Sequence, residues 1–135
     1  MNEEEHSPIT RRILIMDEEP SIRSMIEKIL TQKGFKVVCA KDGADAIRLY
    51  QSAQALQHPF DVVILDLTVV FGMGAVETIK QLIEIDSGVK GIVSSGCHFD
   101  DVIVNPCKYG FCGAIAKPFS VNELVTTINE TIENG

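Results

Sequence analysis

The chain has few basic side chains and no long apolar run. Its 12 Lys and Arg residues are outnumbered by 19 Asp and Glu residues, which gives a net charge of -7. That balance argues against direct binding to nucleic acid, because phosphate backbones are bound by basic faces. No stretch approaches the roughly 20 apolar residues of a membrane span, and the polar segment 1–10 lacks the apolar core of a signal peptide. We therefore expect a cytoplasmic protein that contacts neither nucleic acid nor membrane directly.

Paired cysteines are also missing. Cys39, Cys97, Cys107 and Cys112 form neither a CxxC motif nor the cluster of a zinc site. A domain of 135 residues can bury enough apolar surface to fold without disulfides. We expect four reduced thiols in a single domain over residues 11–134, preceded by a disordered segment at 1–10.

Five short apolar runs alternate with amphipathic stretches. The runs lie at about 12–16, 36–40, 61–65, 90–94 and 112–116. This alternation predicts an α/β fold with a parallel sheet covered by helices on both faces. A right-handed doubly wound arrangement has the strand order 2-1-3-4-5 and brings the ends of strands one, three, four and five around one crevice.

Local signals mark where the first two helices and the last one begin or end. Pro20 suits a first helical turn and Gly34 suits the end of that helix. Asp42 is expected to cap the second helix, and the spacing of Ser120 and Glu123 is that of a capping box at the start of the last helix.

The two remaining helices are expected to differ in regularity. The third helix should carry Val76, Ile79 and Ile83 on its half-buried face and end near Gly88. The fourth should be short or kinked, because Pro106 removes a backbone donor within 100–109.

Acidic side chains follow two of the predicted strands. Asp17, Glu18 and Glu19 come directly after the first run, and Asp66 comes directly after the third. The carboxyl ends of neighbouring parallel strands meet at one edge of the sheet. Like charges brought together there are unfavourable unless a cation lies between them. The sequence therefore predicts a divalent-metal site at this edge.

Two further strand ends add a hydroxyl group and a positive charge. Ser95 follows the fourth predicted strand, and Lys117 follows the fifth. With the expected strand order, both side chains face the acidic cluster. Ser95 has a plainer alternative role, which is to satisfy a local backbone donor.

The motifs ILIMDEEPSIR, VVILDL, IVSSG and AKPFS occur in this order. Together they resemble the receiver domain of two-component response regulators over residues 11–133, and in detail the receiver modules of bacterial hybrid sensor histidine kinases. The resemblance implies a flavodoxin-like (βα)5 fold and a phosphoacceptor signalling function in a phosphorelay. It implies a sensor histidine kinase or a histidine phosphotransfer protein as partner. A homodimer through the face formed by 100–109, 112–116 and the last helix is implied as well.

The same resemblance implies the roles of the site residues. Asp66 would accept a phosphoryl group from a phosphohistidine, and Asp17 and Glu18 would hold Mg²⁺ together with Asp66 and the backbone carbonyl of Thr68. Lys117 would pair with a phosphoryl oxygen, or with Asp66 before phosphorylation, and Ser95 would donate its hydroxyl to the phosphoryl group. Such a domain is no enzyme beyond its own Mg²⁺-dependent phosphorylation and slow dephosphorylation. Since no output segment follows the last predicted helix, we expect it to act on another chain or on parts of a longer protein.

The sequence departs from the family pattern in three places. Glu18 stands where Asp is usual, Val70 and Phe71 replace a usual Pro-Gly pair, and Ala114 stands where an aromatic residue often turns inward on activation. These departures leave open an alternative, a receiver-like docking or dimerisation module that does not switch. An aspartyl-phosphate phosphatase would need a second acid where Thr68 stands. A mononucleotide binder would need a glycine-rich loop where the first acidic cluster lies.

Overall fold

Five parallel strands form a single sheet in the computed structural model, which describes residues 10–134. The strands are β1 (Arg12–Met16), β2 (Lys36–Ala40), β3 (Val62–Asp66), β4 (Gly91–Ser95) and β5 (Gly113–Ala116), in the order β2-β1-β3-β4-β5. The expected fold class and strand order are confirmed. Strands β3 and β4 lie one residue later than expected, so Asp66 and Ser95 are the last residues of their strands, and β5 begins one residue later.

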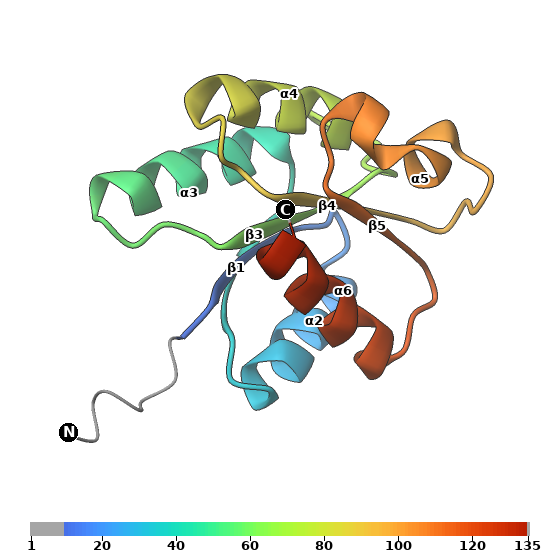
Figure 1. Ribbon diagram of the computed structural model, residues 1–135, viewed down its shortest axis with the longest axis horizontal. Helices are drawn as coiled ribbons and strands as arrows, with labels where there is room; N and C mark the ends of the chain where they lie inside the picture. The colour runs from blue at the N-terminus through green and yellow to red at the C-terminus, as the bar shows by residue number, and fades with distance from the viewer. Residues whose placement is uncertain (1–9, 135) are drawn as a thin grey trace.

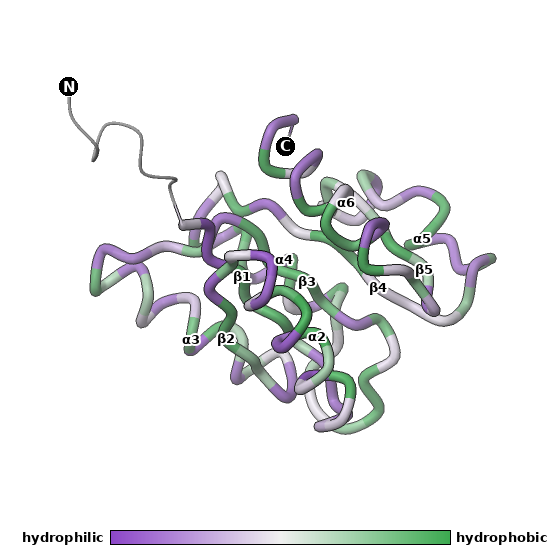
Figure 2. The backbone as a smooth tube through the Cα atoms, turned by 90° about the horizontal axis from the view of Figure 1, so that it is seen from below, coloured by the Kyte–Doolittle hydropathy of each residue, from purple (hydrophilic) through white to green (hydrophobic). Residues whose placement is uncertain are grey.

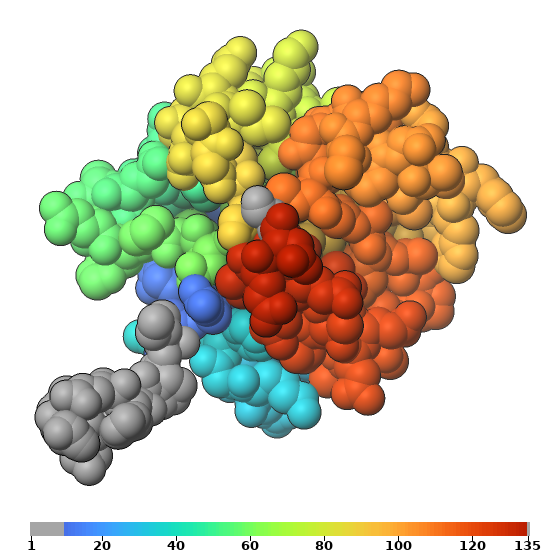
Figure 3. All heavy atoms as spheres, viewed as in Figure 1, coloured from blue at the N-terminus to red at the C-terminus, as the bar shows by residue number. Residues whose placement is uncertain are grey.

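Helices cover both faces of the sheet (Figure 1). Helices α3 (Gly43–Ala55), α4 (Ala75–Ile85) and α5 (Asp101–Val104) lie on one face, and α2 (Pro20–Gln32) and α6 (Val121–Asn134) lie side by side on the other. In Figure 3 the atoms of α6, drawn in red, cover the middle of the view next to α2, drawn in cyan. The fold thus has three layers, with the sheet in the middle.

The pleat of the strands divides the core into two clusters. Leu14 and Met16 of β1 point toward α3 and α4, whereas Ile13 and Ile15 point toward α2 and α6. All four side chains are at most 1% exposed. Figure 2 shows hydrophobic and hydrophilic residues alternating along α3 and α6, as expected for helices with one face on a sheet.

The expected helix signals at four termini are confirmed. Pro20 occupies the first turn of α2, and Gly34 follows that helix with φ of 93°. The side chain of Asp42 accepts a hydrogen bond from the backbone N–H of Asp45 at the start of α3. Before α6, the Ser120 hydroxyl accepts from the N–H of Glu123 at 3.0 Å, and the Glu123 carboxylate accepts from the N–H of Ser120 at 2.8 Å.

Helix α4 differs from the expectation in two ways. It ends at Ile85 instead of near Gly88, because Asp86 leaves the helix and its Oδ1 accepts the N–H of Gly88 at 3.0 Å in the following turn. Its buried side chains are Ala75, Thr78, Ile79 and Leu82. Val76 and Ile83 instead lie at the edge of the face, 37% and 36% exposed.

The segment around Pro106 is broken, as expected. Helix α5 has only four residues and is followed by a 3-10 turn, η1 (Pro106–Tyr109), that ends at Gly110 with φ of 98°. The Asp101 carboxylate joins the two pieces by accepting hydrogen bonds from Asn105, Lys108 and Tyr109. These three hydrogen bonds lower the pKa of Asp101 to about 2, and the one from the Tyr109 hydroxyl contributes most.

Two composition-based expectations can be compared with the described residues. Cys39, Cys97, Cys107 and Cys112 are all free thiols. Between residues 10 and 134, no helix has the length and apolar character needed to cross a membrane. Disorder is expected for residues 1–10, of which 1–9 lie outside the described part of the chain. That expectation stays a prediction.

Candidate functional site

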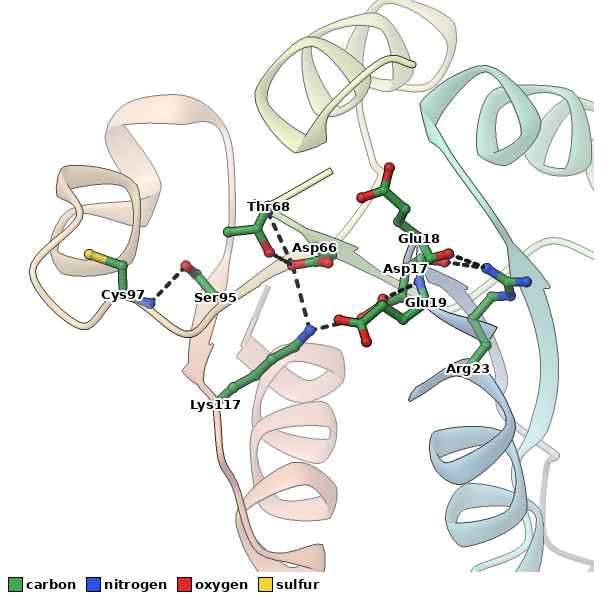
Figure 4. Close-up of polar contacts among 9 residues, drawn as sticks. All are labelled: Asp17, Glu18, Glu19, Arg23, Asp66, Thr68, Ser95, Cys97 and Lys117. Carbon is green, nitrogen blue, oxygen red and sulfur yellow. Dashed lines mark hydrogen bonds and ion pairs between the residues drawn. The ribbon is translucent and has the colours of Figure 1, made fainter. Parts of the chain in front are cut away.

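The carboxyl ends of β1, β3 and β5 bring three charged side chains together (Figure 4). Asp17 directly follows β1, Asp66 ends β3, and Lys117 directly follows β5. The register pairs Met16 with Leu65, which places Asp17 next to Asp66 across the sheet. The two aspartates are only 2% and 4% exposed. Two carboxylates are therefore held close together in a site that is almost completely buried.

Lys117 supplies the opposite charge. Its Nζ lies 2.8 Å from Oδ2 of Asp17 and 3.6 Å from Oδ1 of Asp66. Burial alone would lower the pKa of Lys117, but the hydrogen bond from its ammonium to Asp17 and the charge of Asp66 outweigh burial and raise it. The ammonium is therefore charged and shared between two carboxylates. The peptide bond from Lys117 to Pro118 is cis.

The two oxygens of the Asp66 carboxylate have different surroundings. Oδ1 accepts the backbone N–H of Thr68 at 3.1 Å and the Thr68 hydroxyl at 2.9 Å. Oδ2 receives no hydrogen bond from any residue between 10 and 134. Thr68 thus fixes the orientation of the carboxylate and leaves one oxygen free for another ligand.

Glu18 lies apart from the aspartate pair. Its carboxylate accepts the backbone N–H of Val70 at 3.0 Å and that of Phe71 at 2.8 Å, both in the loop after β3. These two hydrogen bonds stabilise the ionised form and lower the pKa of Glu18. Figure 4 shows this side chain directed away from Lys117.

Arg23 is a site residue that the sequence argument missed. Its guanidinium donates to the backbone carbonyls of Asp17 at 2.7 Å and Glu18 at 3.1 Å, and Oδ1 of Asp17 accepts the N–H of Glu19 at 2.9 Å. Together these contacts fix the turn between β1 and α2. The only sequence signal was the position of a basic residue one turn into the helix that follows the acidic cluster.

The serine pair at the end of β4 lies on the opposite side of Asp66 from Asp17. Ser95 is buried, and its hydroxyl accepts the N–H of Cys97 at 3.0 Å, which is the local role left open from the sequence. Ser94 pairs with Asp66 in the sheet register. Its hydroxyl is buried and has no hydrogen-bond partner among residues 10–134. His98 also reaches the site, with Nε2 3.1 Å from the carbonyl oxygen of Lys117.

The oxygen atoms at this edge are suited to a hard divalent cation. Mg²⁺ is commonly held in proteins by one or two carboxylates, with water in its other positions. Asp17 and Asp66 provide two carboxylates that are next to each other in the sheet register. Within residues 10–134, however, no three His, Cys, Asp or Glu side chains converge as they stand, and the nearby acid Glu18 is bound to the loop after β3. The donor set fits Mg²⁺, with Asp17 and Asp66 as its centre.

A three-layer doubly wound fold with buried aspartates and a lysine at one sheet edge defines a class of signalling domains, and comparison with known proteins agrees. Residues 13–129 match the family described as the response regulator receiver domain. The chemotaxis protein CheY of Bacillus subtilis is 30% identical over 125 residues, which cover 92% of this chain and 99% of CheY. Sporulation initiation phosphotransferase F of the same organism is 26% identical and covers 86% of this chain and 89% of its own length.

Solved structures show the same fold. A response regulator receiver domain protein from Clostridium thermocellum superposes with a TM-score of 0.81 at 23% identity, covering 91% of this chain and 94% of its own. A chain of the CheX-CheY-BeF3-Mg²⁺ complex from Borrelia burgdorferi gives a TM-score of 0.80 at 21% identity, covering 93% of this chain and 90% of its own.

The chain belongs to the response regulator receiver domain family. It is a receiver domain of the kind found in CheY-like response regulators of two-component systems, and its function is phosphoacceptor signalling. The alternative of a docking module that does not switch is not favoured.

Proposed function

We propose that Asp66 is the phosphoacceptor and takes a phosphoryl group from a phosphohistidine of another protein. The observation that supports this is the free Oδ2 of a carboxylate whose Oδ1 is already held by Thr68. Attack by Oδ2 forms the O–P bond of an acyl phosphate and breaks the P–N bond. The leaving imidazole keeps the electron pair and takes up a proton from solvent. Such a transfer depends mainly on alignment and on neutralising charge on the phosphoryl oxygens.

Lys117 and Ser95 would bind the new phosphoryl group. The Lys117 ammonium already contacts both aspartates and needs only a small shift to reach a phosphoryl oxygen. The Ser95 hydroxyl accepts from Cys97 but still has its own hydrogen to donate. A hydrogen bond from Ser95 to the phosphoryl group would exist only in the phosphorylated state and would pull on the loop after β4. A contact of that kind can bias a two-state element.

Asp17, Asp66, the Thr68 carbonyl and Glu18 are the residues that would hold Mg²⁺. The ion would supply positive charge next to the phosphoryl oxygens as negative charge develops there. Asp17 and Asp66 are next to each other in the sheet register and need only exchange their shared Lys117 contact for the cation. The BeF3 and Mg²⁺ named for the Borrelia burgdorferi complex fit this proposal.

The phosphodonor would be a sensor histidine kinase or a histidine phosphotransfer protein in the cytoplasm. An apolar hollow of about 380 Å³ beside Lys117 supports this, because a partner protein could bury apolar side chains there. The hollow is lined by Ile22, Met25, Lys117, Pro118 and Phe119. We further propose that the domain works within or alongside a hybrid histidine kinase.

A homodimer is proposed through the face formed by α5, η1, β5 and α6. This face has a second hollow of about 510 Å³ between β5 and α6, which a second copy could fill. Sedimentation velocity with and without beryllofluoride and Mg²⁺ tests this. A shift toward a dimer on addition supports the proposal, and a monomer under both conditions at high protein concentration contradicts it.

Labelling by a small phosphodonor tests the acceptor. The chain is incubated with acetyl phosphate or phosphoramidate and Mg²⁺, and its intact mass is measured. We expect one added phosphoryl group that is lost on treatment with hydroxylamine and is absent from Asp66→Asn. Asp61→Asn is the matched control, because Asp61 lies directly before the same strand and binds Arg12 instead of the site. Equal labelling of Asp66→Asn and the native chain would disprove the assignment.

A further inference from the structure

Glu18 holds the exposed tip of the loop after β3, whose ends are held by the packing of Val69 on the core and by the hydrogen bond from the N–H of Gly43 to the carbonyl of Met73. The backbone N–H groups of Val70 and Phe71 donate to its two carboxylate oxygens, although these residues follow Glu18 by 52 and 53 positions in the chain. The side chains of these two residues are 74% and 79% exposed and cannot anchor the loop by packing. A carboxylate that accepts two N–H donors makes charge-assisted hydrogen bonds, which are stronger than neutral ones. The position of Val70 and Phe71 therefore depends on Glu18.

The length of the Glu18 side chain matters for this contact. An aspartate at this position would be shorter by one C–C bond of about 1.5 Å. With the turn before α2 fixed by Arg23, that shorter carboxylate could not keep both amides at hydrogen-bond distance. The extra methylene of Glu18 is what lets it span from β1 to the loop after β3.

The Glu18 carboxylate cannot bind the loop amides and lie beside Asp17 and Asp66 at the same time. Each Glu18 oxygen accepts one loop amide, and these hydrogen bonds hold the side chain directed away from Lys117 in Figure 4. No three potential ligands converge in the described part of the chain while Glu18 holds this position. For its carboxylate to approach a cation held by Asp17 and Asp66, the side chain has to release Val70 and Phe71.

We propose that Glu18 is a positioning residue with two alternative partners, the amides of Val70 and Phe71 or a divalent cation bound by Asp17 and Asp66. This inference rests on the metal site of the proposed function. Because one carboxylate serves both partners, cation binding loosens the loop that carries Val70 and Phe71, and anything that holds that loop in place weakens cation binding by the same factor. The cation thus changes the order of an exposed apolar segment beside the phosphoacceptor before any phosphoryl group arrives.

Amide hydrogen exchange, followed by NMR during a Mg²⁺ titration, tests this in the full chain. Without Mg²⁺, we expect the Val70 and Phe71 amides to be protected, and saturating Mg²⁺ to speed their exchange about ten-fold or more, as expected for loss of charge-assisted hydrogen bonds. In Glu18→Asp, exchange should be fast from the start and should not respond to Mg²⁺. The same variant should bind Mg²⁺ about five-fold or more tightly, because no hydrogen bonds to the loop have to break first.

Glu19→Asp is the matched control. It removes one methylene from the neighbouring acid, whose side chain makes no hydrogen bond at the start of α2. It should leave both exchange and Mg²⁺ affinity unchanged. Protection of Val70 and Phe71 that persists at saturating Mg²⁺ would overturn the proposal, as would an unchanged Mg²⁺ affinity in Glu18→Asp.

Failure of this coupling can be distinguished from failure of the proposed function. If Mg²⁺ causes no shifts at Asp17 and Asp66, the metal site of the proposed function fails and the coupling is overturned with it. If Mg²⁺ binds there and the loop amides do not respond, only the coupling is overturned.

Discussion

The ammonium of Lys117 donates a hydrogen bond to Oδ2 of Asp17 at 2.8 Å across 100 positions of the chain. The two residues follow β5 and β1, which are separated in the sheet by β4 and β3. The same ammonium lies 3.6 Å from Asp66 on β3. A single cation thus balances two buried carboxylates and ties an edge strand to the centre of the sheet.

Replacing Lys117 by methionine should destabilise the domain at neutral pH. The change leaves two nearly buried carboxylates without a counter-charge, and breaking a buried ion pair costs about 3 kcal/mol or more. We expect urea unfolding to show a loss of that size, and addition of Mg²⁺ to restore part of it. Lys108→Met is the control, because Lys108 pairs with Asp101 on the surface and should change stability by less than about 1 kcal/mol. Equal losses in both variants would contradict the prediction.

Asp101 should titrate well below an ordinary aspartate. Its pKa is lowered from 3.8 to about 2, first by the Tyr109 hydroxyl and then by Asn105 and Lys108. Because the folded pKa is the lower one, Asp101 contributes stability that is complete above about pH 4 and is lost as pH falls toward 2. Carboxyl NMR should give a midpoint near 2 in the native chain and a higher one in Tyr109→Phe. A native midpoint near 3.8 would refute this.

Gly43→Ala should disturb the packing of α3 on α4. An added Cβ would lie 1.9 Å from the hydroxyl oxygen of Thr78 and 2.9 Å from Cβ of Met73. Thr78 cannot easily move, because its hydroxyl donates to the carbonyl of Gly74 at 2.6 Å. We expect a loss of about 2 kcal/mol in unfolding free energy.

Two further variants separate this clash from a backbone effect. Thr78→Ala removes the clashing atom, so Gly43→Ala should cost clearly less in that background than in the native chain. Gly96→Ala should be nearly neutral, since an added Cβ there meets nothing within 4 Å. If Gly43→Ala costs the same with and without Thr78, the steric explanation is wrong.

Ser94→Ala should stabilise the domain. The Ser94 hydroxyl is buried without a partner in the described structure, and an unsatisfied buried polar group costs about 1 kcal/mol or more. Ser95→Ala should do the opposite, because it removes the acceptor for the N–H of Cys97. Thermal unfolding of the two variants therefore should move the midpoint in opposite directions. A decrease for Ser94→Ala would show that its hydroxyl has a partner.

Much of the fold could be predicted from the sequence because its signals are local. Alternating apolar runs gave the sheet, and Pro20, Asp42, Ser120 and Pro106 marked the helix boundaries that the structure shows. The end of α4 was misplaced because Asp86 closes the turn with its own side chain, which competes with the helix before Gly88 is reached.

The meeting of Asp17, Asp66 and Lys117 was predictable from the sequence, but their contacts and the part played by Arg23 were not. The carboxyl ends of parallel strands lie at one edge of the sheet, so Asp17, Asp66 and Lys117 meet there whichever rotamers their side chains adopt. That Lys117 lies closer to Asp17 than to Asp66 depends on the reach of one flexible side chain. The hydrogen bonds of Glu18 to the loop and of Arg23 to the turn before α2 join segments through backbone groups, which leave no trace in residue types.

The break at Pro106 has a mechanical meaning. A continuous helix would act as a rod that carries a displacement of residues 96–100 along its whole length to the far end. Here α5 and η1 are two stiff pieces joined at Asn105, and Asp101 is the tether between them. We therefore expect a displacement of the loop after β4 to rotate α5 about this joint.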